Sequence, residues 1–298
     1  MTFEPGNAVV VRDEQLLATY GRAFRKIGKT IAVVPLGADV HAGHIELIRA
    51  AKSLLGAYVF VTYSGEEVPE TFRNEGVDVV FHGELRTAVS VRTGMEHLDD
   101  ADAMAHDVAR ILAVLNATHA TDLVMGEKDF ELLVATQLAV SGLRMEVKLH
   151  SVPTVRMPNG LALSLRNERV AEDAHDQALA LSAALTAGAH AAELRRRRGG
   201  RRRPGAGEAG RRGGGRGGAR GREGRRGPGL VDTARGGEES GVAQAYLAVR
   251  DLAMREAPAQ GDARLLAAID LPATDGGTVR LHDNVGLPLG IGFKHIED

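Results

Sequence analysis

The sequence contains no cysteine and no tryptophan among its 298 residues, and aromatic residues make up only 4% of it. The lack of cysteine excludes disulfides and thiolate catalysis, although it gives no firm indication of the redox compartment. No apolar run is long enough to span a membrane, and the N-terminus has no charged segment followed by an apolar one. We therefore expect a cytoplasmic protein without a membrane partner.

The overall composition hides a strong charge asymmetry. Hydrophobic residues make up 44% of the chain and charged residues 26%, which allows a sizeable core and suits two domains. The formal net charge is −2, but residues 195–226 hold 14 arginines against two acidic residues, Glu208 and Glu223. The rest of the chain therefore carries a net charge of roughly −14. Residues 195–226 are therefore strongly basic, whereas the rest of the chain is acidic.

The arginine-rich tract follows a predicted amphipathic helix, residues 174–194. Residues 195–229 are mostly arginine and glycine, with too few apolar side chains to offset chain entropy, so we expect disorder over 195–240. Three interpretations stay open: a frameshifted stretch of GC-rich coding sequence, a solvated linker, and a nucleic-acid contact of the Arg/Gly type. Charge alone rarely implies function, so nucleic-acid binding is not expected. The intact mass of the native protein tests the frameshift.

Predicted strands alternate with predicted helices through the first half of the chain. This alternation favours an α/β fold with a parallel, right-handed, Rossmann-like sheet. We predict a nucleotide-binding domain over residues 1–156 and a smaller C-terminal α/β domain over 157–298. The expected strands are residues 30–36, 57–63, 77–81, 122–125 and 145–152.

The first candidate site is the block His41-Ala42-Gly43-His44, which follows the apolar strand 30–36. It opens a helical pattern of apolar residues at Ile45, Ile48, Ala51 and Leu55. The first amides of a helix attract phosphate, Gly43 allows close approach, and the spacing puts both imidazoles on one face. A zinc site would need a third ligand, such as Asp39 or Glu46, and no metal site is predicted.

Two further blocks occupy similar places. Gly126-Glu127-Lys128-Asp129 follows the strand 122–125 and leads into a helix with apolar positions, so Lys128 lies where open α/β sheets bind ligands. Its ammonium is a compact charge suited to phosphate. In Leu163-Ser164-Leu165-Arg166-Asn167, an extended loop would put Ser164 and Arg166 on the same side, facing one anion. Taken singly, each block is equally compatible with a solvated helix start or loop.

Together the blocks resemble the pantothenate synthetase (pantoate–β-alanine ligase) family of the nucleotidyltransferase superfamily. The family pattern Pro-Thr-Met-Gly-Ala-Leu-His-Glu-Gly-His-Leu aligns without gaps on residues 35–45. Gly-Glu-Lys-Asp-Tyr-Gln-Gln-Leu aligns with residues 126–133, and Asp-Gly-Leu-Ala-Met-Ser-Ser-Arg-Asn with residues 159–167. Residues 3–6 resemble the family's opening segment, and residues 245–251, 264–266 and 280–284 resemble its small C-terminal sheet.

The resemblance implies a two-step reaction that uses Mg²⁺ and ATP. Pantoate would attack the α-phosphate to give pantoyl adenylate and pyrophosphate, and β-alanine would then displace AMP. His44, His41 and Lys128 would be catalytic, with His44 as proton donor, and the family is usually a homodimer. The implied nucleotide-binding residues are Gly37, Ala38, Asp39, Val40, His41, Ala42, Gly43, His44, Gly126, Glu127, Lys128, Asp129, Val155, Leu163, Ser164, Leu165 and Arg166.

The chain departs from the family pattern on the acid side. Two family glutamines hold pantoate; one is not visible after the strand 57–63, which runs directly into Ser64-Gly65, and the other is replaced by Leu132. The second serine of the third block is Leu165. Losing two polar contacts should cost several kcal/mol of binding, at roughly 1 to 3 for each. Another residue compensates, or the acid differs, or the chain is catalytically impaired.

Overall fold

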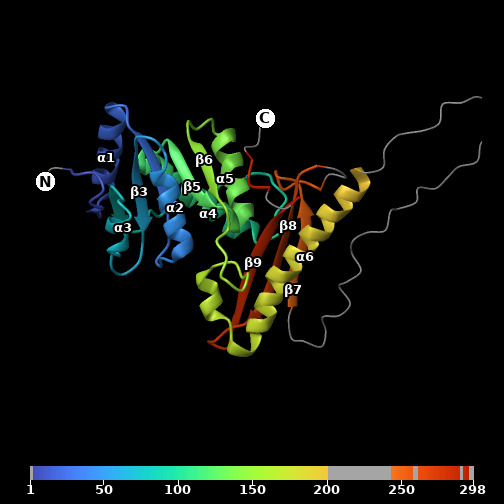
Figure 1. Ribbon diagram of the computed structural model, residues 1–298. Helices are drawn as coiled ribbons and strands as arrows, with labels where there is room; N and C mark the ends of the chain where they lie inside the picture. The colour runs from blue at the N-terminus through green and yellow to red at the C-terminus, as the bar shows by residue number, and fades with distance from the viewer. Residues whose placement is uncertain (1–2, 201–242, 258–260, 289–290, 295–298) are drawn as a thin grey trace, which may run out of the picture.

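The larger part of the protein is a six-stranded parallel sheet with the strand order β1-β4-β3-β2-β5-β6. The computed structural model describes residues 3–200, 243–257, 261–288 and 291–294 (Figure 1). This arrangement confirms the predicted parallel α/β fold. The strands are β1 Val9–Val11, β2 Thr30–Pro35, β3 Ala57–Tyr63, β4 Val79–His82, β5 Asp122–Gly126 and β6 Lys148–Val152.

The strand order reverses between β2 and β5. From β2 the chain adds β3 and β4 on one side, whereas β5 and β6 lie on the other side. In open α/β sheets this reversal leaves a crevice at the carboxyl ends of the two central strands, where ligands bind. The His41 block follows β2 and the Lys128 block follows β5, so both blocks begin at this crevice.

Both faces of the sheet are covered by helices, which explains why the central strands are apolar without alternation. In β2, Ile31 and Val33 belong to one buried cluster, and Ala32 and Val34 belong to the cluster on the opposite face. The first cluster includes side chains of α1, α4 and α5, and the second those of α2 and α3. The helices are α1 Glu14–Lys26, α2 Ala42–Lys52, α3 Thr71–Asn74, α4 Ala101–Thr118 and α5 Phe130–Gly142.

Two local expectations need correction. The sequence pattern predicts that this helix continues to Leu55. Helix α2 instead ends at Lys52 with Ser53 as its C-cap, and Leu55 is fully exposed. Leu55 lies three positions beyond the last helical residue, so the helical pattern does not predict whether its side chain is buried. The three-residue strand β1, which pairs with β4 at the sheet edge, was not predicted.

The smaller part combines a three-stranded antiparallel sheet with one long helix. Strands β7 Ala243–Arg250, β8 Ala263–Pro272 and β9 Thr278–Leu287 pair in the order β7-β8-β9. Helix α6, His175–Gly200, packs along this sheet (Figure 1). This confirms the predicted helix 174–194 and the small C-terminal sheet, while the domain boundary near residue 156 stays a prediction. Helix α6 continues to Gly200, so the expected disorder is wrong for residues 195–200. The rest of the arginine-rich tract, residues 201–240, lies outside the described residues.

Three short 3₁₀ helices complete the described fold; the first lies within the larger part, and the other two lead from the larger sheet to α6. They are η1 Glu127–Asp129 after β5, and η2 Leu165–Arg169 and η3 Glu172–Ala174 between β6 and α6. Within the described residues, no helix combines the length and apolar character needed to cross a membrane.

Candidate active site

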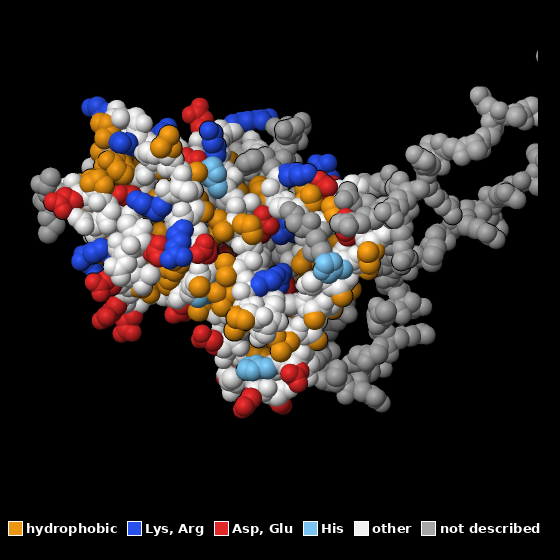
Figure 2. Space-filling model, viewed as in Figure 1, with side chains coloured by type: hydrophobic (Ala, Val, Ile, Leu, Met, Phe, Trp, Pro, Cys, Tyr) orange, Lys and Arg blue, Asp and Glu red, His pale blue; other side chains and the backbone are white. Residues whose placement is uncertain are grey.

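A cavity of about 660 Å³ lies at the carboxyl ends of the three adjacent strands β2, β5 and β6. Their final residues, Pro35, Gly126 and Val152, all line it. Residues of η2 and the segment before it form the opposite wall, so the cavity lies between the two parts of the molecule. In the space-filling view, a basic side chain is visible where the two parts of the molecule meet (Figure 2). A second cavity of about 510 Å³ shares Arg110, Lys128, Asp129, Leu132, Arg166 and Arg169 with the first.

His41 and His44 form the floor of the cavity and also the start of α2. The His41 backbone is the N-cap of the helix, and its Nδ1 accepts a hydrogen bond from the Gly43 amide at 3.0 Å. His44 Nδ1 in turn accepts from the His41 amide at 3.4 Å. Because each Nδ1 needs a lone pair for this bond, both neutral rings carry their proton on Nε2. The helix cap therefore leaves two Nε2–H donors.

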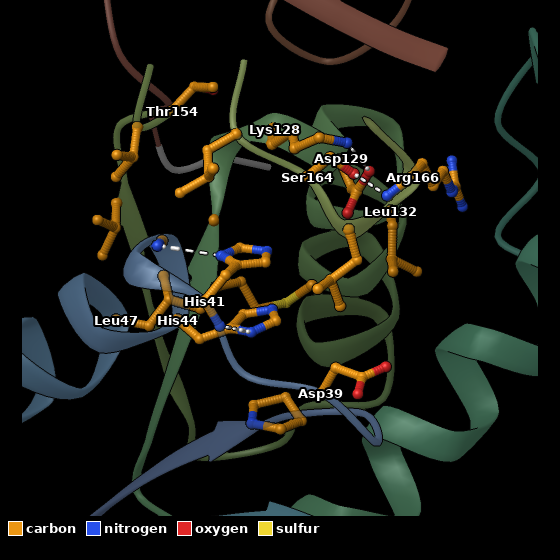
Figure 3. A pocket seen from close by; sticks show the side chains of 18 of the residues that line it. Asp39, His41, His44, Leu47, Lys128, Asp129, Leu132, Thr154, Ser164 and Arg166 are labelled. Carbon is orange, nitrogen blue, oxygen red and sulfur yellow. Dashed lines mark hydrogen bonds and ion pairs between the residues drawn. The ribbon is translucent and has the colours of Figure 1, made fainter. Parts of the chain in front are cut away.

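The two rings stack with centroids 3.8 Å apart and planes inclined by 15° (Figure 3). Burial, and then the neighbouring His41, lower the pKa of His44 to about 4. Burial, followed by the charge of Lys128, also lowers the pKa of His41. Both imidazoles are therefore neutral hydrogen-bond donors near pH 7. The amide of Gly43 already donates to His41 Nδ1, and the amide of His44 to the His41 carbonyl oxygen. The donors available to an anion are therefore the Nε2–H groups of the two imidazoles and not these helix amides.

We predict that the Cε1 proton of His44 in the ligand-free protein titrates near pH 4 in an NMR pH series. The unfolded chain takes up a proton at this histidine near pH 6.5, but the folded chain does not until much lower pH. As the pH falls from 6.5 towards 4, the unfolded state binds more protons, so the free energy of unfolding falls. A His44 titration at or above pH 6.5 would contradict this environment.

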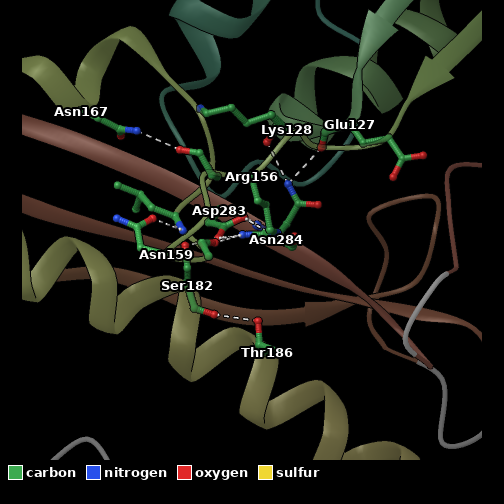
Figure 4. Close-up of polar contacts among 12 residues, drawn as sticks. Glu127, Lys128, Arg156, Asn159, Asn167, Ser182, Thr186, Asp283 and Asn284 are labelled. Carbon is green, nitrogen blue, oxygen red and sulfur yellow. Dashed lines mark hydrogen bonds and ion pairs between the residues drawn. The ribbon is translucent and has the colours of Figure 1, made fainter. Parts of the chain in front are cut away.

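Lys128 lies on η1, directly after β5, with only 18% of its side chain exposed. Its Nζ is 3.6 Å from Oδ1 of Asp129, and the positive charge of Lys128 holds the pKa of Asp129 below its ordinary value. The turn itself is fixed from the small sheet. Asn284 on β9 donates from Nδ2 to the carbonyl oxygens of Glu127 and Lys128, at 3.0 and 2.8 Å (Figure 4). Lys128 is thus held at the cavity by a residue 156 positions away.

Behind this turn lies a buried ion pair that connects the two sheets. Arg264 on β8 donates from Nη2 to Oε2 of Glu127 at 2.7 Å, and its Nε donates to Oδ1 of Asn284 at 2.7 Å. The two charged side chains are 4% and 6% exposed. The amide of Phe293 and the hydroxyl of Ser151 donate to the other carboxylate oxygen of Glu127. Since both carboxylate oxygens are bonded behind the turn and Glu127 does not line the cavity, it is a positioning residue.

A second ion pair fixes the opposite wall. Arg156 donates to both carboxylate oxygens of Asp283 on β9, at 2.7 and 2.9 Å, and the Ser182 hydroxyl of α6 donates to the same carboxylate at 2.6 Å (Figure 4). Asp283 is 2% exposed. These contacts hold the segment that leads from β6 to Ser164 against the small sheet. The sequence indicates residues 280–284 only as part of the small sheet, and this role of Asp283 was not predicted.

The expected extended loop at Ser164 and Arg166 is wrong. Ser164 is the N-cap of η2, and its Oγ accepts from the Arg166 amide at 3.3 Å, because serine readily bonds a backbone donor two residues ahead. Both side chains still line the cavity. Arg166 donates from Nη1 to Nδ1 of His282 at 3.1 Å, and Nε2 of His282 lies 2.8 Å from Asp99. Burial lowers the pKa of His282, consistent with a neutral ring between these two groups.

Most of the predicted nucleotide-binding residues line this cavity. Figure 3 shows Lys128, Ser164 and Arg166 along the wall near the stacked imidazoles. Five predicted residues do not line it: Gly37, Ala38, Val40, Ala42 and Glu127. The carbonyl of Gly37 accepts from the Ser64 amide on the neighbouring turn. The predicted residues that do line it are Asp39, His41, Gly43, His44, Gly126, Lys128, Asp129, Val155, Leu163, Ser164, Leu165 and Arg166.

Thr154 and Arg110 line the cavity but were not predicted. The Thr154 hydroxyl is buried and has no hydrogen-bond partner within the described parts of the chain. Its position directly before Val155 is the signal that could have identified it. Arg110 lies on α4, and no motif marks it.

The pantoate-β-alanine ligase family model matches residues 66–286 of this chain. The pantothenate synthetase of Corynebacterium jeikeium is 34% identical, over 100% of this chain and 96% of the relative. The pantothenate synthetase of Saccharopolyspora erythraea is also 34% identical, over 97% of this chain and 94% of the relative. The chain belongs to the pantoate-β-alanine ligase family.

Solved structures of this family have the same fold. The crystal structure of pantothenate synthetase from Thermus thermophilus matches with a TM-score of 0.64 at 18% identity, over 93% of this chain and 98% of that one. The Francisella tularensis pantoate-β-alanine ligase, complexed with β-γ ATP and β-alanine, matches with a TM-score of 0.61 at 17% identity, over 95% and 99%. At this identity the likeness concerns the fold.

Two departures from the family pattern lie in the cavity wall itself. Leu132, at the position of the second family glutamine, lines both cavities, and Leu165 lines the first. The first glutamine position has no counterpart, because β3 passes directly into the turn at Ser64, whose amide bonds to Gly37. At these positions the cavity wall is therefore more apolar than the family pattern implies. Among the described residues, no three His, Asp or Glu side chains gather into a metal-binding group.

Proposed function

We propose that this protein condenses pantoate with β-alanine in an ATP-dependent reaction that releases AMP and pyrophosphate through a pantoyl-adenylate intermediate. The observation that carries this proposal is the convergence of His41, His44, Lys128, Ser164 and Arg166 on one cavity at the switch point of the sheet. Full-length similarity to pantothenate synthetases supports it and does not favour the alternative of a different acid.

The first step would use the cavity chiefly for positioning and charge neutralisation. A carboxylate oxygen of pantoate attacks the α-phosphorus, and the bond to the bridging oxygen of the β-phosphate breaks. His41 and His44 would donate from Nε2 to phosphate oxygens as negative charge shifts onto pyrophosphate, because a preorganised N–H donor stabilises developing charge without reorganising. Lys128 and Arg166 would hold the phosphates, and the Ser164 hydroxyl would add a further donor.

In the second step the amine of β-alanine attacks the acyl carbon of the adenylate, and the acyl–oxygen bond to AMP breaks. Mg²⁺ would enter with ATP and neutralise phosphate charge. The carboxylates of Asp39, Asp129 and Glu168 line the cavity, and one or two of them would complete the coordination of a magnesium ion held by phosphate oxygens. We place the reaction in the cytoplasm, where ATP is available, and the homodimer implied by the resemblance stays a prediction.

Exchange of labelled pyrophosphate into ATP tests the proposal, because it reports adenylate formation and needs the acid but not the amine. Exchange that depends on pantoate is expected for the full chain. Exchange with another small hydroxy acid but not with pantoate would favour a related adenylate-forming enzyme. No exchange with any acid would indicate a chain that has lost catalysis.

A further inference from the structure

The acid-facing wall of the cavity contains few polar groups. Side chains from β5, α2, α4 and α5 form an apolar surface there, which includes Leu47, Ile111, Met125 and Leu132. On the proposed function, the acid substrate lies against this wall with its carboxylate towards the phosphates. Because desolvation of an unpaired carboxylate is costly, this wall needs a charged or polar partner.

Arg110 on α4 is a cation in this part of the cavity. It lines both cavities, as does Leu132, the residue at the second glutamine position. Its guanidinium contacts Asp107, one turn earlier in the same helix, with Nη2 and Oδ1 3.3 Å apart. Both side chains are more than 40% exposed, so this pair is worth little and exchanges readily for another anion.

The other arginines that line the first cavity, Arg166 and Arg169, lie on its phosphate side. Arg166 donates to His282, and Arg169 lies 3.8 Å from Asp275 at the turn of the small sheet. Lys128 is beside Asp129. These groups lie on η1 and η2, on the phosphate side, whereas Arg110 comes from the helix that bears Ile111.

We propose that Arg110 binds the carboxylate of the acid substrate and thereby replaces the contacts of the two missing glutamines. This assignment rests on the proposed function and makes Arg110 a specificity-determining residue. A guanidinium is suited to the task because its planar N–H groups can donate to one carboxylate oxygen while the other attacks the phosphorus. It favours acids whose remaining surface is apolar enough to pack against Leu132 and Ile111.

Pyrophosphate exchange in the full-length protein tests this proposal, with the half-saturating concentration of each substrate as the readout. Arg110→Gln should raise the half-saturating pantoate concentration about 10-fold or more, because a charge-assisted hydrogen bond is lost. The value for ATP should stay within about twofold. Arg110→Lys should recover part of the loss. Asp107→Asn is the matched control: it breaks the same helix pair but keeps the guanidinium, so pantoate binding should change less than about twofold.

The outcomes separate this proposal from the proposed function. If the wild-type protein exchanges with pantoate and Arg110→Gln binds pantoate normally, the assignment of Arg110 is overturned while the function stands. An equal loss in Asp107→Asn would show a structural role of the helix pair and would also overturn it. If the wild-type protein uses only another acid, the proposed function fails, and Arg110 is then tested with that acid. A selective loss of β-alanine affinity in the complete reaction would place Arg110 at the amine site instead.

Discussion

Replacing His44 with alanine is expected to lower kcat by about 10²–10³-fold, with a much smaller change in the half-saturating concentration of ATP. The Nε2–H of His44 would act mainly where charge develops on the departing pyrophosphate, and removing one such donor has an effect of this size. Steady-state kinetics of the complete reaction and pyrophosphate exchange measure it. Full activity in the alanine variant would show that the histidine pair is not the reacting part of the cavity.

His44→Gln is the matched control for this experiment. Glutamine can present an N–H donor close to the position of Nε2 but has no ionisable ring, so it should recover part of the lost rate if hydrogen bonding is what matters. His44 also accepts from the His41 amide, so both variants lose part of the helix cap. That loss should lower the free energy of unfolding by about 1 kcal/mol, which thermal unfolding followed by circular dichroism can verify.

Replacing Arg264 with methionine is expected to lower the free energy of unfolding by about 3–5 kcal/mol, because it leaves the Glu127 carboxylate buried without its cation. The midpoint of chemical denaturation should fall accordingly. Activity should fall too, since Arg264 also bonds to Asn284, which holds the Lys128 turn.

The double variant Glu127→Leu with Arg264→Met is the control for that prediction. Removing both charges avoids an unpaired buried ion and should restore most of the stability lost in the single variant. If the single variant unfolds at the denaturant concentration of the wild-type protein, the ion pair does not stabilise the contact between the sheets.

The sequence predicted the sheet well where burial on both faces produces long apolar runs. The bounds of β3 agree with the expected residues 57–63, and β2 ends one residue earlier than expected. The His41 and Lys128 blocks were each predicted to follow a parallel strand, and both line the cavity. The strand β1 was missed because three residues are too few to show a pattern.

What could not be predicted depends on contacts between distant parts of the chain. The family resemblance placed Glu127 among the nucleotide-binding residues, but its carboxylate bonds to Arg264, 137 positions later. The bonds from Asn284 to the Lys128 turn and from Arg156 to Asp283 likewise join residues that are far apart in the sequence. Local spacing indicates which element a residue belongs to, but not which partner it meets after the two sheets have packed.

His41 and His44 both cap α2 and line the cavity, which limits the substitutions that can stabilise this helix. Serine or aspartate at position 41 would make a better N-cap than histidine, and the helix would begin more firmly. Such a change would also remove an Nε2–H from the cavity floor and, for aspartate, add a negative charge where a triphosphate should bind. Thermostability engineering that optimises helix starts one by one would therefore select folded but inactive proteins at this position, a local form of the trade-off between stability and activity.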